Sequence, residues 1–503
     1  MSTTGGTRRR RPRRDRAREE ETVAKSAKRK YSHCQQDDDS QGGKMMRNSV
    51  PTLPEDIWSY ILSLMPMRDV ARSACVCRAF LQSWRCHPNL SFDADALGLC
   101  ETDFTNTVDH ILKKHSGIGV KRFKLLVQYK LDICDYVNSW LQFAVTPGIE
   151  ELSLWLSRSK PWYNFPCSLF SDRIANSIRY LELGYCAFHP TIDVGSLRNL
   201  KRLQLSCVRI SGDELACVLS NSLALEQLEL TCCLNIISLK MPCLLQRLDY
   251  LKVLECRRVQ VIESNAPNLS RFYYSGYKVK FSLEESLQVK NLYVCRPNIT
   301  SYARANLPSS VPNVETLAIA SHCEMKDTPL LPTKFLHLKH LTISLSAWTF
   351  SPNYDYFSLV SYLDASPLLE VFILAISQEC IESESIFESC SHLRQMPEYR
   401  HEHLNSATIS GFCSGKSLVE LTCHIVENTT SLECLTLDTT HGDGRCSGNG
   451  SSLCSPASQS VLMESPRTLL AVRRYIEGKI PPGVKLNVVE LCRLCTRCDA
   501  LLR

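Results

Sequence analysis

Residues 225–256 read LEQLELTCCLNIISLKMPCLLQRLDYLKVLEC, and this stretch holds the pattern that decides the fold. A short core with apolar residues at Leu228 and Leu230 returns 23 residues later, at Leu251 and Val253. Apolar residues that alternate with polar ones are typical of a β-strand, because successive side chains point to opposite faces of a sheet. The recurrence of one short strand indicates a stack of similar units.

The same strand core occurs eleven times along the chain. Its first apolar residues are Leu152, Leu181, Leu203, Leu228, Leu251, Phe272, Leu292, Leu317, Leu341, Phe372 and Leu435. The first ten lie 20 to 31 residues apart, and most spacings fall within the range of leucine-rich repeats. Such units stack into a curved parallel sheet that buries the leucines. We therefore predict an α/β protein in which a leucine-rich-repeat solenoid follows a small all-α unit.

Cysteine has a fixed place in several of these units. Cys186, Cys233 and Cys256 each follow the second apolar core residue by three positions, which is the Asn/Cys position of the repeat consensus. A small buried polar side chain there can satisfy backbone groups where the chain leaves the strand. The chain has 26 cysteines, is long and shows no secretory signal, so we expect reduced, buried thiols rather than disulfides.

The residues between the buried leucines should face the concave surface of the sheet. The candidates for binding a protein substrate there are Tyr180, Glu182, Arg202, Gln204, Tyr250, Lys252, Tyr273 and Tyr293. Tyrosine and arginine are favoured at recognition hot spots. The alternative is an ordinary exposed sheet face, which is also chemically mixed.

Residues 53–80, LPEDIWSYILSLMPMRDVARSACVCRAF, predict two helices upstream of the repeats. Pro54, followed by the acidic Glu55 and Asp56, is typical of the first turn of a helix. The apolar residues Ile57, Ile61 and Leu64 are spaced so that they lie on one face of that helix. Pro66 ends that helix, and a second, apolar on more than one face, follows. Some 40 residues are too few for a good core, so the extra apolar surface suggests either a partner or packing on the repeats.

The segment up to Trp84 resembles an F-box, through Leu53-Pro54, the apolar first helix, Asp69-Val70 and Val76-Cys77-Arg78-Ala79-Phe80. Many plant members have Ser-Lys-Arg-Trp where this chain has Cys77-Arg78-Ala79-Phe80. The resemblance implies a non-catalytic receptor that binds the Skp adaptor of a cullin-based ubiquitin ligase. The implied adaptor-binding residues are Leu53, Pro54, Ile57, Ile61, Leu62, Leu64, Met65, Val70, Val76, Cys77, Phe80 and Trp84.

Residues 396–438 resemble the FBD segment of plant F-box/leucine-rich-repeat proteins, through the run from His401 to Leu404, ISGF (409–412) and LVELTCHIVENTTSLECLTLD. The predicted organisation is a basic tail (1–48), the F-box (50–92), a linker or first degenerate repeat (93–148) and the repeats (149–440). The FBD-like segment occupies about 390–440 of the repeats. A Gly/Ser-rich linker (441–465) and a C-terminal segment (466–503) follow.

Two basic clusters dominate the N-terminal tail. They are formed by Arg8, Arg9, Arg10, Arg11, Arg13, Arg14, Lys28, Arg29 and Lys30. They are typical of a bipartite nuclear-localisation signal, and a nucleic-acid arm or a solvated tail are the alternatives. No aromatic residues are interleaved with the arginines, which disfavours single-strand nucleic-acid binding. We expect a nuclear or cytoplasmic protein, or one found in both.

The remaining motifs point to no chemistry. A zinc site could form from Cys492, Cys495 and Cys498 only with a fourth ligand such as Cys454 or His441. We therefore assign no metal and interpret these three cysteines as reduced thiols. We find no phosphate-binding loop, dinucleotide fingerprint, HExxH or GxSxG motif, and we expect no cofactor, enzyme activity or membrane span. The leading hypothesis is a ubiquitin-ligase substrate receptor; the alternatives are a nuclear repeat scaffold without ligase activity and a small-molecule receptor.

Overall fold

The computed structural model describes residues 53–77, 79–94, 101–117, 119–127, 133–158, 162–190, 197–282, 288–347, 354–378, 384–388, 392–394, 400–440 and 457–492. The predicted localisation signal, Cys495 and Cys498 lie outside these residues, as do Cys454 and His441. The chain divides into the units Met1–Leu53 and Pro54–Arg503. The fold described below is that of the second unit.

Three short helices open this unit: α1 (Glu55–Ser63), α2 (Met67–Val76) and α3 (Ala79–Arg85). Pro54 and Pro66 stand directly before α1 and α2. Proline suits this position because its fixed φ leads into a helix and its missing N–H would have had no helical partner. None of the described helices has the length and apolarity needed to cross a membrane.

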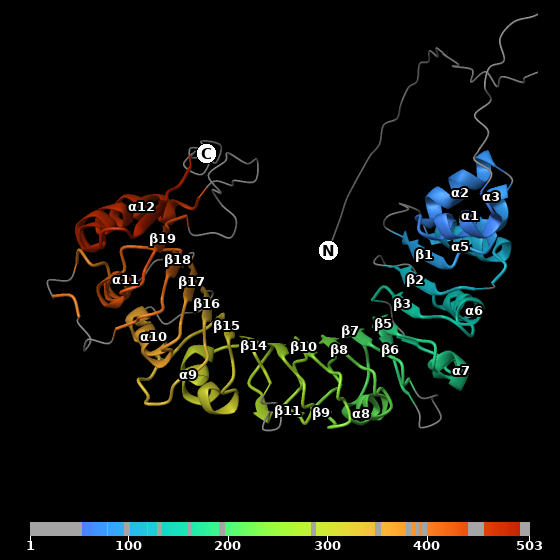
Figure 1. Ribbon diagram of the computed structural model, residues 1–503, viewed down its shortest axis with the longest axis horizontal. Coiled ribbons are helices and arrows are strands. Elements are labelled where there is room, and N and C mark those ends of the chain that lie inside the picture. The colour runs from blue at the N-terminus through green and yellow to red at the C-terminus, as the bar shows by residue number, and fades with distance from the viewer. Residues whose placement is uncertain are drawn as a thin grey trace, which may run out of the picture. The chain divides into compact units, whose positions relative to one another are not determined.

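A single parallel sheet of 15 strands follows the helices (Figure 1). In order across the sheet these strands are β1 (Asn89–Asp93), β2 (Arg122–Leu126), β3 (Glu151–Trp155), β5 (Tyr180–Gly184), β7 (Arg202–Ser206), β8 (Gln227–Thr231), β10 (Tyr250–Leu254), β12 (Arg271–Ser275), β14 (Asn291–Cys295), β15 (Thr316–Ser321), β16 (His340–Ala347), β17 (Val371–Gln378), β18 (Ser406–Ser410), β19 (Cys434–Asp438) and β20 (Lys485–Val489). All eleven predicted strand cores lie in this sheet, and the predicted fold class is confirmed.

The connecting segments cover one side of this sheet. They contain α5 (Glu101–Lys114), α6 (Cys134–Ala144), α7 (Asp172–Ala175), α8 (Gly212–Ser220), α9 (Ile299–Ser310), α10 (Val360–Ala365), α11 (Lys416–Asn428) and α12 (Gln459–Ala471). Short strands take the place of helices in the middle repeats: β9 (Ser238–Met241), β11 (Val261–Ser264) and β13 (Lys280–Ser282), besides β4 (Tyr163–Asn164) and β6 (Cys186–Ala187). Figure 1 shows α6 to α11 on the same side of the sheet, and we call the opposite side the open face.

The strand register stacks like residues on like. Leu228 pairs with Leu203 on one side and Leu251 on the other, and all three are fully buried. Most strands therefore add two or three apolar side chains to one continuous core, while alternate side chains lie on the open face. This arrangement explains why a two-residue alternation was sufficient to locate most of the sheet.

The predicted cysteine positions mark the exits of the strands. Tyr185, Cys232 and Glu255 adopt left-handed φ values of 52–55° directly after their strands, and the buried Cys186, Cys233 and Cys256 come next. The Cys233 thiol donates to the carbonyl oxygen of Leu205 over 3.5 Å, and its backbone N–H donates to Cys256 Sγ over 3.3 Å. The thiols of Cys233 and Cys256 satisfy backbone groups as expected. None of the cysteines in the described ranges forms a disulfide.

The sheet is longer than the predicted repeat region at both ends. β1 lies at the end of the predicted F-box segment, β2 lies within the predicted linker 93–148, and β20 lies within the C-terminal segment. The FBD-like segment folds as β18, α11 and β19, so it is one further repeat of the solenoid. Within the predicted linker 441–465, residues 441–456 lie outside the described ranges, and α12 begins at Gln459.

Candidate protein-interaction surfaces

The first candidate surface is an apolar stripe on α1. Ile57, Ile61 and Leu64 are 42%, 36% and 70% exposed, and we call these three residues the α1 stripe. Their spacing places them on one side of the helix. Exposed apolar residues that cluster on one face mark interaction sites. Leu53, just before the helix, is also exposed.

The structure separates the other predicted adaptor-binding residues by burial. Leu62 and Val70 are 3% and 0% exposed, so they belong to the interior of the helical unit and we remove them from the candidate surface. Pro54 and Val76 are exposed, and Val76 is the most exposed of the set at 88%. The partly buried members are Met65, Cys77, Phe80 and Trp84.

The helical unit is fastened to the first strand of the sheet. His87 is buried, and its Nε2 atom lies 3.2 Å from the carbonyl oxygen of Met65. The Asn89 side-chain amide donates to the carbonyl oxygen of Ser63 over 3.0 Å. The Nε2 atom of His115, at the end of α5, lies 2.9 Å from the carbonyl oxygen of His87. These contacts join the α1–α2 turn, β1 and the end of α5.

The second candidate surface is the open face of the sheet. Tyr250, Tyr273 and Tyr293 lie on the adjacent strands β10, β12 and β14, and we call these three residues the tyrosine cluster. The ring centroids of Tyr250 and Tyr273 are 5.3 Å apart, and those of Tyr273 and Tyr293 are 6.2 Å apart. Burial is the main cause that raises the pKa of Tyr293 to about 12, so its hydroxyl is a neutral donor at pH 7.

Charged side chains border the tyrosine cluster. Lys252 pairs with Glu229 across neighbouring strands, with 3.3 Å between Nζ and Oε2. The Arg271 guanidinium, held by Asp249, lies 5.1 Å from the centre of the Tyr250 ring. These contacts restrain the aromatic rings, and restrained aromatic side chains lose little entropy when a partner binds. On the open face, two or three strands before β10, lie Tyr180, Glu182, Arg202 and Gln204.

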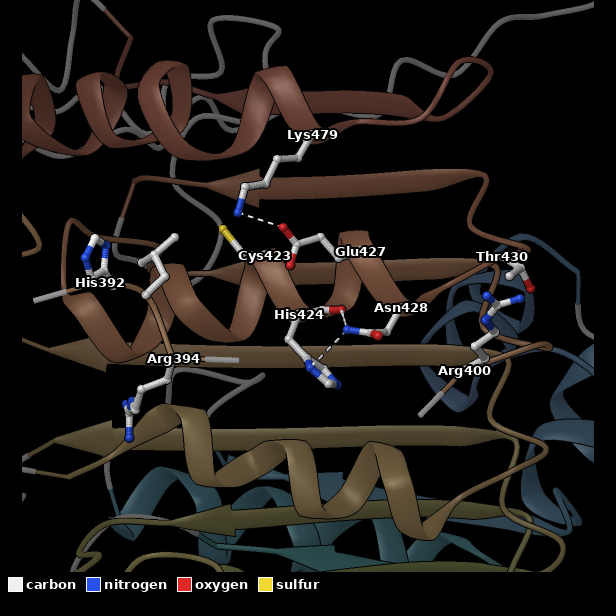
Figure 2. A pocket seen from close by; sticks show the side chains of 10 residues that line it. His392, Arg394, Arg400, Cys423, His424, Glu427, Asn428, Thr430 and Lys479 are labelled. Carbon is white, nitrogen blue, oxygen red and sulfur yellow. Dashed lines mark hydrogen bonds and ion pairs between the residues drawn. The ribbon is translucent and has the colours of Figure 1, made fainter. Parts of the chain in front are cut away.

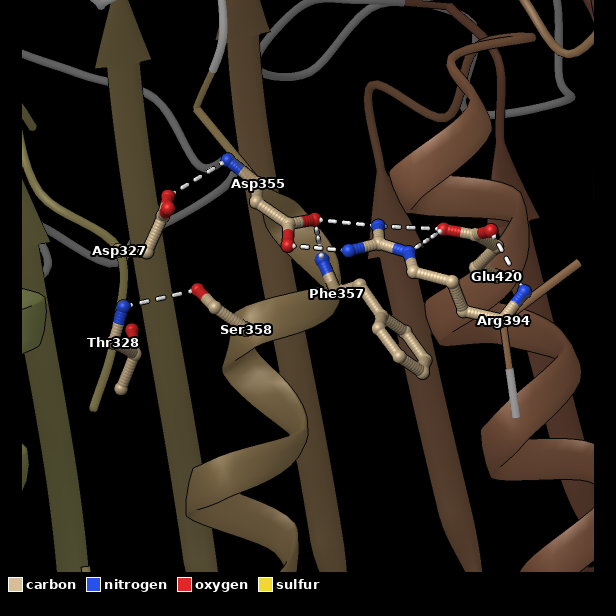
Figure 3. A network of polar contacts seen from close by, with 7 residues as sticks. All are labelled: Asp327, Thr328, Asp355, Phe357, Ser358, Arg394 and Glu420. Atoms are coloured by element: carbon tan, nitrogen blue, oxygen red, sulfur yellow. Dashed lines mark hydrogen bonds and ion pairs between the residues drawn. The ribbon is translucent and has the colours of Figure 1, made fainter. Parts of the chain in front are cut away.

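The C-terminal repeats hold a polar network that the sequence did not indicate (Figure 3). The Arg394 guanidinium donates to both oxygens of Asp355, over 2.7 and 2.8 Å, and to Glu420 Oε2 over 2.7 Å. Glu420 is 1% exposed, and the Arg394 backbone N–H donates to its second oxygen over 2.9 Å. Hydrogen bonds to Asp355, ahead of those to Glu420, raise the pKa of Arg394.

A cavity of about 700 Å³ lies beside this network (Figure 2). Its lining includes His424 and Asn428 of α11, and Lys479, whose Nζ lies 2.8 Å from Glu427 Oε1. Burial lowers the pKa of His424 to about 4, and the nearby Glu427 opposes that shift. The ring is therefore neutral at pH 7.

His401 and Asp364 lie close to His424. The ring centroids of His401 and His424 are 5.8 Å apart, and His401 Nε2 is 3.8 Å from Asp364 Oδ1. Burial, helped by His424, lowers the pKa of His401 to about 4. Burial raises the pKa of Asp364 to about 6, against the opposing effects of Arg304 and Lys334. No spacing motif joins these residues along the chain, although His401 lies in the FBD-like run quoted above.

Comparison with known proteins identifies both parts of the chain. Residues 51–92 match the F-box domain, and residues 111–493 match a family model described as At1g61320/AtMIF1, LRR domain. The F-box assignment and the repeat assignment are thereby confirmed. The second match covers most of the sheet and includes the FBD-like segment.

Three curated relatives come from Arabidopsis thaliana. Putative F-box/LRR-repeat protein At5g02930 is 26% identical over 240 residues, and the match spans only 48% of this chain and 48% of that relative. Putative FBD-associated F-box protein At1g61330 is 22% identical over 434 residues, 79% of this chain and 92% of the relative. F-box/FBD/LRR-repeat protein At1g13570 is 23% identical over 416 residues, 78% of this chain and 92% of the relative. The chain therefore belongs to the family of F-box proteins that carry a leucine-rich-repeat domain of the At1g61320/AtMIF1 type.

Proposed function

We propose that this protein is the substrate-receptor subunit of a Skp–cullin–F-box ubiquitin ligase. The observation that supports this role is the α1 stripe, an apolar surface left exposed on a unit that matches the F-box domain. In this role the helical unit binds a Skp-type adaptor, and the adaptor connects it to a cullin. The receptor itself needs no catalytic residue.

The repeats bind the protein to be ubiquitinated, and the tyrosine cluster is the part of the open face best suited to that task. It combines three aromatic rings with hydroxyl groups, which is the composition of recognition hot spots. Ubiquitin transfer is then accelerated by proximity, because the receptor holds a substrate lysine near the charged conjugating enzyme. The basic clusters of residues 8–30 take the protein to the nucleus.

Copurification with a Skp adaptor tests the proposal. Wild-type protein should retain the adaptor, and Ile61→Asp or Leu64→Asp should abolish retention, because each places a charge on the apolar interface. Leu223→Asp is the matched control, since Leu223 is 47% exposed and lies outside the helical unit. Equal adaptor recovery from wild type and the α1 variants would contradict the proposal and favour the scaffold alternative.

A further inference from the structure

Three metal-ligating side chains meet in the C-terminal repeats. Asp364 lies on α10, His424 lies on α11, and His401 forms a β-bridge with Thr429 just after α11. One ligand atom from each residue lies within 4.8 Å of the other two. The cluster joins α10, in the connection from β16 to β17, to α11, in the connection from β18 to β19, so anything bound there would link these two repeats.

The surroundings leave two of these ligand atoms without a hydrogen-bond partner in the described part of the chain. They are Asp364 Oδ1 and His424 Nε2, and both atoms are buried. A buried polar atom without a partner is costly and calls for an unplaced water or ion. The third atom is His401 Nε2. The backbone of His401 is held next to α11, because its backbone N–H donates to the carbonyl oxygen of Asn428 over 2.8 Å.

We propose that Asp364, His401 and His424 bind a divalent transition-metal ion of the zinc class, with the fourth position taken by water. Two neutral imidazoles and one carboxylate are a ligand set that zinc accepts, whereas calcium and magnesium prefer oxygen ligands alone. His424 lines the 700 Å³ cavity, which provides the entry path. The metal would tie α10 to α11 and stabilise the last repeats.

Metal binding requires small, defined changes at the site. Zinc–ligand bonds of about 2.0–2.2 Å place tetrahedral ligand atoms roughly 3.3 Å apart, so the side chains must close by up to about 1.5 Å from the present separations. The Asn428 amide nitrogen lies 3.2 Å from His424 Nδ1, an arrangement that keeps the ring proton on Nε2. On binding, that proton moves to Nδ1, and the amide turns so that its oxygen accepts it.

Metal titration of the full-length, reduced protein tests the inference. After removal of metals with a chelator, Co²⁺ and Zn²⁺ are added, and bound equivalents are compared between wild type, His401→Gln and His424→Gln. His401→Gln and His424→Gln should each bind one equivalent of metal fewer than wild type. The Co²⁺ spectrum of the lost equivalent should lack thiolate charge-transfer bands, which distinguishes this site from metal bound to cysteines. His403→Gln is the matched control, because His403 is exposed and lies two residues from His401.

Two further measurements guard against loss of folding. Zinc should raise the melting temperature of wild type and of His403→Gln but not that of His424→Gln, while the three metal-free proteins melt cooperatively. Asn428→Ala should weaken zinc binding by about 10–100-fold, as expected for a residue that orients a ligand. Equal metal equivalents in all variants, or no thermal shift with zinc, would overturn the inference. The buried polar atoms of the cluster would then be explained by a buried water or by a direct His401–Asp364 contact.

Discussion

Trp58 and Phe80 pack against each other across α1 and α3, with ring centroids 4.9 Å apart and ring planes inclined by 57°. Phe80 was predicted from sequence as an adaptor-binding residue, and the structure gives it a role inside the helical unit as well. The unit is small and buries few side chains completely. One aromatic pair therefore makes a large contribution to its stability.

Phe80→Ala should destabilise the helical unit by about 1–2 kcal/mol, less than a fully buried Phe→Ala because Phe80 is half-buried. The unit should open locally while the sheet stays folded. Hydrogen exchange should therefore speed up in α1 to α3 and remain unchanged in β7 to β15. Uniform acceleration over both regions would show that the two are one cooperative unit.

Tyr273→Ala should weaken substrate binding about 30-fold or more, which corresponds to a hot-spot loss of about 2 kcal/mol. Tyr273 stands between Tyr250 and Tyr293, so its removal disrupts both ring contacts. Adaptor binding should be unaffected. Affinity for a substrate captured by proximity labelling under proteasome inhibition measures the effect, and Tyr277→Ala, at an exposed tyrosine beyond β12, is the control.

Arg394→Met should lower the stability of the C-terminal repeats by about 2–4 kcal/mol. Among the described residues, the change leaves the buried Glu420 carboxylate with the backbone N–H of residue 394 as its remaining partner. A second change, Glu420→Gln, should recover part of the loss by removing the uncompensated charge. Hydrogen exchange in α11 reports the effect, and a double variant as unstable as the single one would contradict this account.

Stability of the metal-free protein should fall as the pH falls from 6.5 to 4.5. The unfolded chain takes up a proton at His401 and at His424 near pH 6.5, whereas the folded chain does so only near pH 4. Asp364 acts in the opposite direction, because its folded pKa of about 6 exceeds its ordinary value of 3.8. The net difference of one proton gives about 1.4 kcal/mol per pH unit.

Thermal melts at several pH values in chelator check this sign. Replacement of one histidine by an uncharged residue, as in His424→Gln, should remove most of the net slope contributed by this cluster. His403→Gln should leave the wild-type slope unchanged. An unchanged or steeper slope in His424→Gln would show that burial does not hold this histidine neutral.

Removal of residues 1–30 should abolish nuclear accumulation of a fluorescently tagged protein, because that segment contains both basic clusters. Adaptor copurification should persist, since the α1 stripe lies outside the removed segment. Replacement of Arg8 to Arg11 by alanine is the finer version of the test. Nuclear accumulation that survives both changes would show that another segment directs localisation.

Eleven strand cores were located from the sequence, including two that begin with phenylalanine, but β2 and β18 were missed. β18 reads SATIS and buries Ala407 and Ile409, and β2 reads RFKLL with Phe123 as its first core residue. Neither strand has leucine at its first core position, which is the commonest mark of a repeat in this chain. β1 directly follows the helical unit, so its short alternation was hidden by the preceding helix pattern.

The candidate surfaces were predictable only in part, for geometric reasons. Helical spacing grouped Ile57, Ile61 and Leu64 correctly, but it could not show that the neighbouring Leu62 turns inward. Strand alternation placed the tyrosine cluster on the open face. The cluster of Asp364, His401 and His424 depends on how successive repeats stack, and its members have no common motif in the chain.

The contacts of His87 and Asn89 with the α1–α2 turn have a consequence for target choice under the proposed function. In a receptor whose adaptor-docking helices are hydrogen-bonded to its first strand, the adaptor and the repeats are held at a fixed distance and orientation. The reach from ligase to bound target is then set by the number of strands between the helices and the contact site. The choice of target lysine would then depend on the distance between the adaptor-docking helices and the strands that bind the target.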